Sequence, residues 1–193
     1  MESFYSIQGE GFHSGKPAYF IRLSGCDVNC HWCDVKESWE ISKDQYMHID
    51  DIVKRVSKAC ADIVVITGGE PLMHDLTVLT KTLKDNDKKV HIETSGTHSL
   101  KGNYDWICFS PKKFKEPLED FFSISDELKV IIYNRSDFKW AEELSKKVSQ
   151  KTELIMQPEW SKEELISPLI LDYIKSNPKW RISVQTHKYL NVQ

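Results

Sequence analysis

The chain has 193 residues, of which 40% are hydrophobic, so it is long enough to form one domain, residues 1–193, with a substantial core. Its net charge of −3 at pH 7 provides no overall basic field and argues against a nucleic-acid partner. It contains no run of roughly 18 apolar residues and no apolar leader segment, so we expect neither a membrane span nor a signal peptide.

Short β-branched, apolar runs recur along the chain and predict strands. These runs are Ala18–Leu23, Ile63–Thr67, Lys89–Glu93, Trp106–Ser110, Glu127–Tyr133, Glu153–Gln157 and Arg181–Gln185. Amphipathic segments between several of the runs predict helices over Ile49–Ala59, Leu76–Lys84, Phe138–Val148 and Glu163–Lys175. Ser136 and Ser161 are the expected N-caps of the last two helices.

The alternation of strands and helices predicts an α/β fold with a mostly parallel sheet. Right-handed crossovers would curl that sheet into a full or partial barrel, or leave it open and doubly wound. Polar turns containing glycine or proline follow several of the predicted strands, and a cysteine-rich loop follows the first. Because ligands bind at the carboxyl ends of parallel strands, these turns predict one active site.

The segment Gly-Cys-Asp-Val-Asn-Cys-His-Trp-Cys-Asp, residues 25–34, holds three of the five cysteines in a C-x3-C-x2-C pattern. Free cysteines without an export signal indicate the reducing cytoplasm, where thiolates bind metal or react. A structural zinc site would need a fourth ligand, from His31, Cys60 or Cys108. An iron–sulfur cluster held by three thiolates would leave one iron open for a small ligand. We interpret Cys60 and Cys108 as buried core residues.

The cysteine pattern resembles the signature of the radical SAM superfamily, in which the open iron binds S-adenosyl-L-methionine (SAM). The segment Gly68–Pro71, Gly-Gly-Glu-Pro, resembles the superfamily motif that binds the methionine amino group. Further motifs, spread in order over almost the whole chain, resemble the 7-carboxy-7-deazaguanine synthase family. They are Ser6–Gly11, Phe20–Arg22, Cys30–Asp34, Glu93–Thr97, Ser110–Lys112, Gln157–Pro158 and His187–Lys188.

This resemblance implies a single-domain partial (β/α) barrel of the radical SAM type, with mostly parallel strands. It implies a lyase with a 4Fe–4S cluster and SAM, which contracts the ring of 6-carboxy-5,6,7,8-tetrahydropterin and releases ammonia, giving 7-carboxy-7-deazaguanine for queuosine-type biosynthesis. A 5′-deoxyadenosyl radical made from SAM would take a hydrogen atom from C6 of the pterin. The resemblance also implies a flavodoxin or ferredoxin as electron donor, and a homodimer.

The resemblance further implies roles for individual residues. The cluster would be ligated by Cys26, Cys30 and Cys33. SAM would lie against Trp32, Cys33, Asp34, Gly69, Ser110, Pro111, Lys112, Gln157, Pro158, Glu159 and Trp160. The pterin would be held by Ile7, Gln8, Gly9, Glu10, Arg22, Thr67 and Gln193. Among these, Arg22 offers the planar fork that pairs best with the substrate carboxylate.

One position departs from the family pattern. Members often carry threonine or serine directly after the Cys-Asp pair, where the hydroxyl helps to bind Mg²⁺, but this chain has Val35. Valine offers no side-chain oxygen, and Mg²⁺ prefers a near-octahedral set of oxygen ligands. We therefore expect turnover that depends weakly or not at all on Mg²⁺.

Two functions of other classes are open at this point. A radical SAM activase, which abstracts hydrogen from a glycine of a partner protein, would share the cysteine loop but would not require Gln8–Gly11 or Arg22. A non-catalytic zinc-binding module would need only the cysteines and a fourth ligand.

Overall fold

The computed structural model describes residues 2–193, and these contain one sheet of eight strands that lie side by side in chain order. The strands are β1 (Glu2–Ile7), β2 (Pro17–Leu23), β3 (Ile63–Gly68), β4 (Lys89–Thr94), β5 (Trp106–Phe109), β6 (Glu127–Ile132), β7 (Glu153–Pro158) and β8 (Trp180–Ile182). β1 is antiparallel to β2, and every later neighbour pair is parallel. The mostly parallel α/β sheet predicted from the sequence is confirmed.

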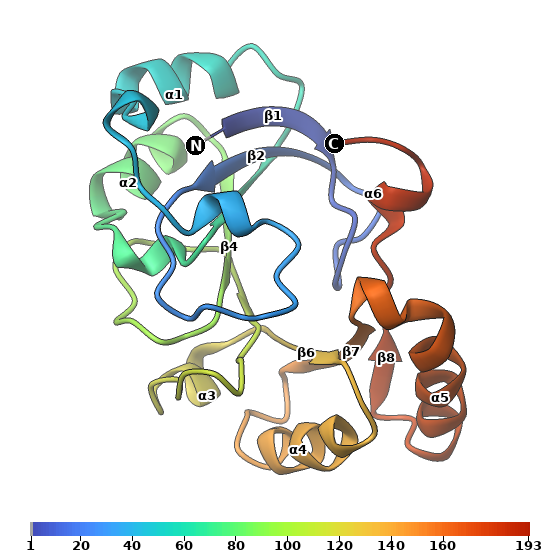
Figure 1. Cartoon of the computed structure of the whole chain (residues 1–193). Coiled ribbons are helices and arrows are strands. Elements are labelled where there is room, and N and C mark those ends of the chain that lie inside the picture. Colours follow the sequence, from blue (N-terminus) through green and yellow to red (C-terminus); the bar gives the residue numbers. More distant parts are fainter. Residues whose placement is uncertain (1) are drawn as a thin grey trace.

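The sheet is curved, with helices on its outer side (Figure 1). The longer helices are α1 (Ile49–Val56), α2 (Thr77–Asp85), α4 (Ser136–Ser145) and α5 (Glu163–Ser176), and the four-residue helices are α3 (Phe121–Ile124) and α6 (Thr186–Tyr189). β1 and β8 form the two edges of the sheet. The C-terminal segment with α6 returns to β1, as the red end of the ribbon shows (Figure 1), so the architecture is a partial barrel.

The main hydrophobic core lies between the sheet and the outer helices. Alternate residues of a strand point to opposite faces, so each parallel strand contributes one residue in two to this core. Its fully buried members include Val64, Leu83, Val90, Leu128 and Ile170. The other face of the sheet points to the inside of the partial barrel, where the polar side chains described below are found.

The predicted strands and helices are confirmed to within a few residues, apart from the last strand. β8 ends at Ile182, not at Gln185. The Ser183 hydroxyl accepts a hydrogen bond from the Gly11 N–H (2.8 Å) and donates one to Gln157 (2.9 Å), and the chain then turns inward. β1 was missed, because its six residues contain little apolar periodicity. Its Phe4 ring stacks on Phe20 with centroids 5.2 Å apart.

The two predicted N-caps were wrong. Ser136 lies inside α4, and its N–H donates to the Asn134 side chain (2.9 Å). Ser161 lies in a short 3₁₀ turn before α5, and its N–H donates to the Glu159 carboxylate (3.1 Å). In both places a side chain two residues earlier accepts the free N–H. Over residues 2–193, the helices are too short or too polar to cross a membrane.

Candidate active site

Polar side chains line the inside of the barrel because strand geometry turns alternate residues inward. On β6, Leu128 and Val130 pack in the outer core, whereas Glu127 and Lys129 point inward. The inward residues of the other strands that reach the same interior include Arg22, Thr67, Glu93 and Gln157. One or two residues from each of β1, β2, β3, β4, β6 and β7 therefore line the cavity.

A cavity of about 450 Å³ occupies this interior at the carboxyl ends of the parallel strands. Nearly all residues assigned to the cofactors or the substrate line it: Ile7, Gln8, Gly9, Glu10, Arg22, Cys26, Cys30, Trp32, Cys33, Asp34, Thr67, Gly69, Ser110, Lys112, Gln157, Pro158, Glu159, Trp160 and Gln193. Pro111 is buried and lies outside the lining. The structure thus brings together motifs that are up to 186 positions apart in the chain, from Ile7 to Gln193.

Cys26, Cys30 and Cys33 lie in the loop after β2, and all three are free thiols. The Cys33 N–H donates to the Cys30 carbonyl (2.9 Å), so a tight turn brings these two together. Burial raises the pKa of the Cys30 thiol to about 11, with Lys112 acting in the opposite direction. Burial thus favours the neutral thiol, and a metal bound at Cys30 would replace its proton.

The arrangement of ligands differs from that of a single-ion centre. Within residues 2–193, no three His, Cys, Asp or Glu side chains surround one metal position. An iron–sulfur cluster does not require three side chains around one metal position, because each thiolate binds a different iron. Three cysteines on one loop, facing one cavity, fit that donor set.

The two remaining cysteines differ from each other. Cys60, which we expected in the core, is exposed at the surface, and its carbonyl accepts from the Tyr5 hydroxyl (3.1 Å). It follows the last turn of α1, where the chain leaves the core for a surface loop. Cys108 is buried as expected, with its Sγ 3.5 Å from Glu127 Oε1.

Gly69 and Glu70 hold the loop after β3 against the cysteine loop. A Cβ atom on Gly69 would lie 2.3 Å from the Gly25 carbonyl oxygen, so only glycine permits this packing. The Glu70 carboxylate is 1% exposed and accepts from the Thr94 hydroxyl (2.6 Å) and the Ser95 N–H (2.8 Å). Strand-end loops of β3 and β4 are thereby tied together behind the cysteines.

Ser110 and Lys112 form the next part of the wall. The Lys112 ammonium donates to the Ser110 hydroxyl (2.7 Å) and to the Ser110 carbonyl. Burial lowers the pKa of Lys112, and the nearby Cys30 acts in the opposite direction. Lys112 thus places a donor beside the cysteine loop.

The segment from Gln157 to Trp160 covers one side of the cavity. Gln157 and Glu159 are buried, whereas Trp160 is partly exposed and packs edge-on against Tyr189, with ring centroids 5.7 Å apart. The Lys188 ammonium lies 4.7 Å from the centre of the Trp160 ring. The segment from Gln157 to Trp160 therefore packs against α6 of the C-terminal segment.

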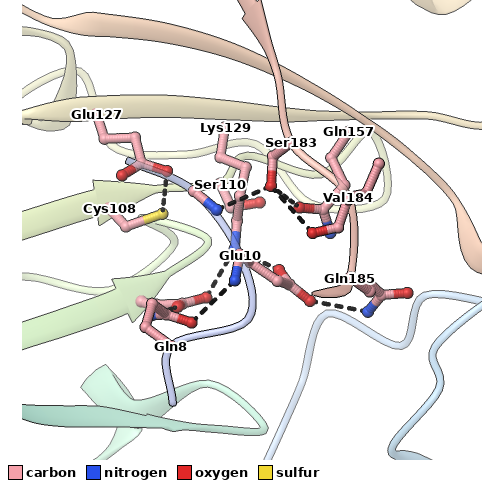
Figure 2. Close-up of polar contacts among 12 residues, drawn as sticks. Gln8, Glu10, Cys108, Ser110, Glu127, Lys129, Gln157, Ser183, Val184 and Gln185 are labelled. Carbon is pink, nitrogen blue, oxygen red and sulfur yellow. Dashed lines mark hydrogen bonds and ion pairs between the residues drawn. The ribbon is translucent and has the colours of Figure 1, made fainter. Parts of the chain in front are cut away.

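Buried charges form the floor of the cavity (Figure 2). The Lys129 ammonium lies 2.6 Å from a Glu10 oxygen and 2.8 Å from a Glu93 oxygen. Burial alone would raise the pKa of Glu10, but Lys129 and side-chain hydrogen bonds bring it down to about 2. Sequence reasoning assigned Glu10, named Glu93 only as part of the motif Glu93–Thr97 without a role, and missed Lys129. A lysine inside the apolar run Glu127–Tyr133 was the available signal, since a buried charge needs partners.

Two further residues that sequence reasoning left without a role, Gln185 and Lys188, connect the floor to the cysteine loop. The Gln185 amide donates to Glu10 (2.8 Å) and to Asp34 (3.2 Å). The Lys188 ammonium donates to the same Asp34 oxygen (2.7 Å). Burial acts to raise the pKa of Asp34, but Lys188 and Gln185 outweigh it and lower the pKa.

His187 closes directly over Gly9. A Cβ atom on Gly9 would lie 2.1 Å from His187 Nδ1, and the Thr186 N–H donates to the Gly9 carbonyl (2.9 Å). The glycine in the Gln8–Glu10 motif is therefore required for the C-terminal segment to dock.

The C-terminus reaches the cavity beside Arg22. Arg22 Nε lies 2.8 Å from one Glu2 oxygen, and the Gln193 amide donates to the other (3.0 Å). The Arg22 side chain is 23% exposed and also lies over the Phe4 ring. The first and last described residues, Glu2 and Gln193, thus contact each other beside this guanidinium.

Val35 lies in the cavity lining and carries no side-chain oxygen. Its carbonyl oxygen accepts from both the N–H (3.0 Å) and the hydroxyl (2.7 Å) of Ser38. The neighbouring Lys36 is exposed and lies over the Trp39 ring, 6.0 Å from its centre.

The loop between β1 and β2 closes the far end of the barrel. The Phe12 ring stacks on Trp106 with centroids 5.0 Å apart, and the His13 ring lies 4.7 Å from that of His91. Burial lowers the pKa of His91 to about 4, and His13 adds to the effect. This loop therefore covers the end of the barrel that lies opposite the carboxyl ends of the strands.

Comparisons with known proteins agree with this geometry. Residues 20–167 match the model of the radical SAM superfamily. A 7-carboxy-7-deazaguanine synthase of Flavobacterium psychrophilum is 55% identical over 100% of this chain and 91% of its own length. The synthase of Synechocystis is 47% identical over 100% of this chain and 92% of its own. The crystal structure of QueE from Escherichia coli superposes with a TM-score of 0.86 at 32% identity, covering 96% of this chain and 92% of that one.

Proposed function

Because the chain belongs to the 7-carboxy-7-deazaguanine synthase family of the radical SAM superfamily, we propose that it converts 6-carboxy-5,6,7,8-tetrahydropterin to 7-carboxy-7-deazaguanine with loss of ammonia. The reaction is of the carbon–nitrogen lyase type and belongs to queuosine-type deazapurine biosynthesis. One observation carries the proposal: a single cavity of about 450 Å³ contains both the cysteine loop and a polar floor. Hydrogen transfer between SAM and a substrate requires such contact.

The cofactors are a 4Fe–4S cluster and SAM. Cys26, Cys30 and Cys33 would hold the cluster, and their shared loop and common cavity support this assignment. When bound, the cluster and SAM would together supply the one-electron chemistry that leads to hydrogen abstraction from the substrate. The chain's own contribution is to position the reactants and to exclude water.

The SAM side of the cavity lies next to the cysteine loop. Gly69 lines the cavity here, and its lack of a Cβ lets the loop after β3 pack closely against the cysteine loop. The remaining contacts proposed for SAM come from Trp32, Cys33, Asp34, Ser110, Lys112, Gln157, Pro158, Glu159 and Trp160, which line the same space. Pro111 lies behind the wall, and we give it the role of holding Ser110 and Lys112 in place.

The pterin side is the floor, with contacts proposed from Ile7, Gln8, Gly9, Glu10, Arg22, Thr67 and Gln193. The amino-pyrimidinone edge of the substrate presents N–H donors, which match the acceptor oxygens of Glu10. Arg22 would bind the substrate carboxylate through its planar fork. Glu2 now occupies one edge of that guanidinium, so substrate binding shares or displaces this contact.

Val35 supports weak dependence on Mg²⁺. Its side chain has no oxygen, and its carbonyl oxygen is already bonded by Ser38. The neighbouring Asp34 is engaged by Lys188 at 2.7 Å. An ion at this place would therefore rest mainly on water and substrate oxygens.

The partners proposed from the family are a flavodoxin or ferredoxin as electron donor and a second copy of the chain in a homodimer. We propose that residues 1–193 act as one radical SAM domain in the cytoplasm. Analytical ultracentrifugation of the anaerobic protein tests the homodimer, and turnover with reduced flavodoxin or ferredoxin in place of dithionite tests the donor.

The function is tested by anaerobic reconstitution with iron and sulfide, followed by dithionite, SAM and the pterin. We expect 7-carboxy-7-deazaguanine, ammonia and 5′-deoxyadenosine to form, and deuterium at C6 of the pterin to enter the deoxyadenosine. Cys33→Ala is the matched inactive control. Formation of deoxyadenosine without product or deuterium transfer would indicate an activase. A colourless protein that contains zinc would contradict the proposal that the chain is a radical SAM enzyme.

A further inference from the structure

Lys129 is a deeply buried charge that faces the cavity, and neither the cofactors nor the assigned substrate contacts account for it. Its side chain is 3% exposed and lies in the middle of β6. Its ammonium joins two carboxylates from separate parts of the chain, Glu10 of the β1–β2 loop at 2.6 Å and Glu93 of β4 at 2.8 Å. A lysine buried in this way must stay paired to remain stable.

Each carboxylate is also held on its second oxygen by an amide. The Gln185 amide donates to Glu10 Oε1 (2.8 Å), and the Gln8 amide donates to Glu93 Oε1 (2.8 Å). The side chains of Glu10 and Glu93 are 17% and 22% exposed, so both carboxylates still present oxygen atoms to the cavity. Lys129 donates to the other oxygen of each carboxylate, which leaves two oriented acceptors on the floor. Figure 2 shows the contacts of Glu10 with Lys129 and Gln185.

The groups around Lys129 determine the charge of the floor. Facing it are Glu10, Glu93, Glu127 and Cys108. Burial raises the pKa of Glu127 and raises that of Cys108 well above its usual value. The Glu127 carboxylate accepts from the Phe12 N–H (3.2 Å) and the Trp106 indole (3.1 Å), so its contacts lie at the closed end of the barrel. Glu10, Glu93 and Lys129 form the ion-paired part of the floor, in which two carboxylates share one ammonium.

We propose that Lys129 is a positioning residue for substrate recognition, which keeps Glu10 and Glu93 ionised and oriented as paired acceptors for the N–H donors of the pterin's amino-pyrimidinone edge. This inference rests on the proposed function. Without Lys129, two neighbouring carboxylates would repel each other, and one would take up a proton. The proton would convert an acceptor into a donor that faces the donors of the substrate.

The test is Lys129→Met, measured as the dissociation constant for the pterin in the reconstituted protein from about pH 6 to about pH 9. We expect binding to weaken about tenfold or more near pH 7, and the loss to shrink as pH rises, because the carboxylates then ionise without help. All values are divided by those of the parent, which removes the titration of the pterin itself. Affinity for SAM is the internal control and should stay within about twofold.

Two variants separate charge from packing. Lys129→Arg keeps the positive charge. The ratio of its pterin affinity to that of the parent should therefore be the same at every pH, even if arginine packs less well and lowers the affinity. Lys179→Met removes a surface ion pair with Glu142 and should change neither ligand's affinity. A loss in Lys129→Met that is independent of pH, or a pH dependence equal in Lys129→Arg, would overturn the proposal.

A further variant applies if Lys129→Met does not fold. Lys129→Met combined with Glu93→Gln removes one charge of each sign, and Glu93→Gln alone is its reference. The double variant should bind pterin with a pH dependence that the reference lacks, through Glu10, and equal profiles would contradict the inference. Failure of the proposed function can be distinguished from failure of this inference. If the proposed function is wrong, the parent itself will not bind the pterin, and the role proposed for Lys129 is then wrong as well.

Discussion

The two ends of the cavity are built on different principles. On the floor, each charged side chain is paired within the chain, as Lys129 is with Glu10 and Glu93. At the cysteine loop, the thiols of Cys26, Cys30 and Cys33 are free and line open space. The floor is therefore preorganised by the protein, whereas the cysteine end is completed by the group that it binds. Changes at the two ends should consequently fail in different ways.

The largest effect is expected at the cysteine end. Cys26→Ala, Cys30→Ala or Cys33→Ala should each abolish SAM cleavage, because two thiolates cannot hold the cluster with its open iron. Iron and sulfide content, together with deoxyadenosine formation, measures the result. The fold should survive, since the hydrogen bonds and ion pairs of the floor do not involve these three thiols.

The other two cysteines are the controls for this result. Cys60→Ala and Cys108→Ser should retain the cluster, because Cys60 lies at the surface and Cys108 is buried beside Glu127. Cys108→Ser tests packing near the floor without touching the cysteine loop. Equal iron loss from Cys60→Ala and Cys33→Ala would mean that the ligands are wrongly assigned.

The next effect concerns the substrate carboxylate at the pterin side. Arg22→Lys should weaken pterin binding by about 2–5 kcal/mol while leaving SAM binding unchanged, because lysine lacks the bidentate fork. Titration with each ligand measures the two affinities separately. A pterin affinity equal to that of the parent would show that Arg22 does not bind the carboxylate.

Glu2 and the C-terminus refine the same prediction. Glu2→Gln removes the carboxylate that now lies 2.8 Å from Arg22, so pterin binding should be unchanged or tighter. Deletion of residues 191–193 removes the Gln193 amide and should weaken pterin binding if the tail contacts the substrate. Weaker binding in Glu2→Gln would show instead that Glu2 orients Arg22 for the substrate.

The comparison of the two ends also explains what the sequence could predict. The cysteine loop and the Gly68–Pro71 segment are continuous motifs, so their chemistry is readable from local spacing. The floor is built from single residues of different strands. The role of Lys129 cannot be predicted from its neighbours in the sequence, because its partner Glu93 comes close only in the folded barrel. The parallel sheet was predictable because apolar runs repeat with regular spacing. Edge strand β1 was not, since its six residues contain little apolar periodicity.

The closed end of the barrel gives a prediction for stability against pH. Burial lowers the pKa of His91 to about 4 from an ordinary 6.5, so its contribution is complete above pH 6.5 and is lost as pH falls toward 4. Near pH 5 the loss should be about 2 kcal/mol. Anaerobic denaturant unfolding at several pH values measures it, with cluster content followed in parallel. His91→Phe should flatten this slope, and the exposed His48→Phe should not. An unchanged slope in His91→Phe would place the sensitivity elsewhere.

The smallest effect is expected at Val35, where the cysteine loop meets the pterin side. In the parent, chelator followed by millimolar Mg²⁺ should change turnover little at saturating SAM and pterin, because position 35 supplies no side-chain oxygen. Val35→Thr adds a hydroxyl of nearly equal shape and should give a modest gain in Mg²⁺ dependence. Val35→Ala, which changes the packing without adding an oxygen, is the matched control, and the chelator must first be shown to leave the cluster intact.

The contacts of Asp34 determine how the opposite result would be understood. Its carboxylate accepts from Lys188 (2.7 Å) and from Gln185 (3.2 Å), which already supply the positive charge and the donors that an ion would replace. A large stimulation of the parent by Mg²⁺ would therefore mean that the ion displaces Lys188 from Asp34. Lys188→Met should then increase the stimulation further. If the parent and Lys188→Met are both insensitive to Mg²⁺, the ammonium and the ion do not compete for Asp34, and Val35 alone accounts for the weak dependence.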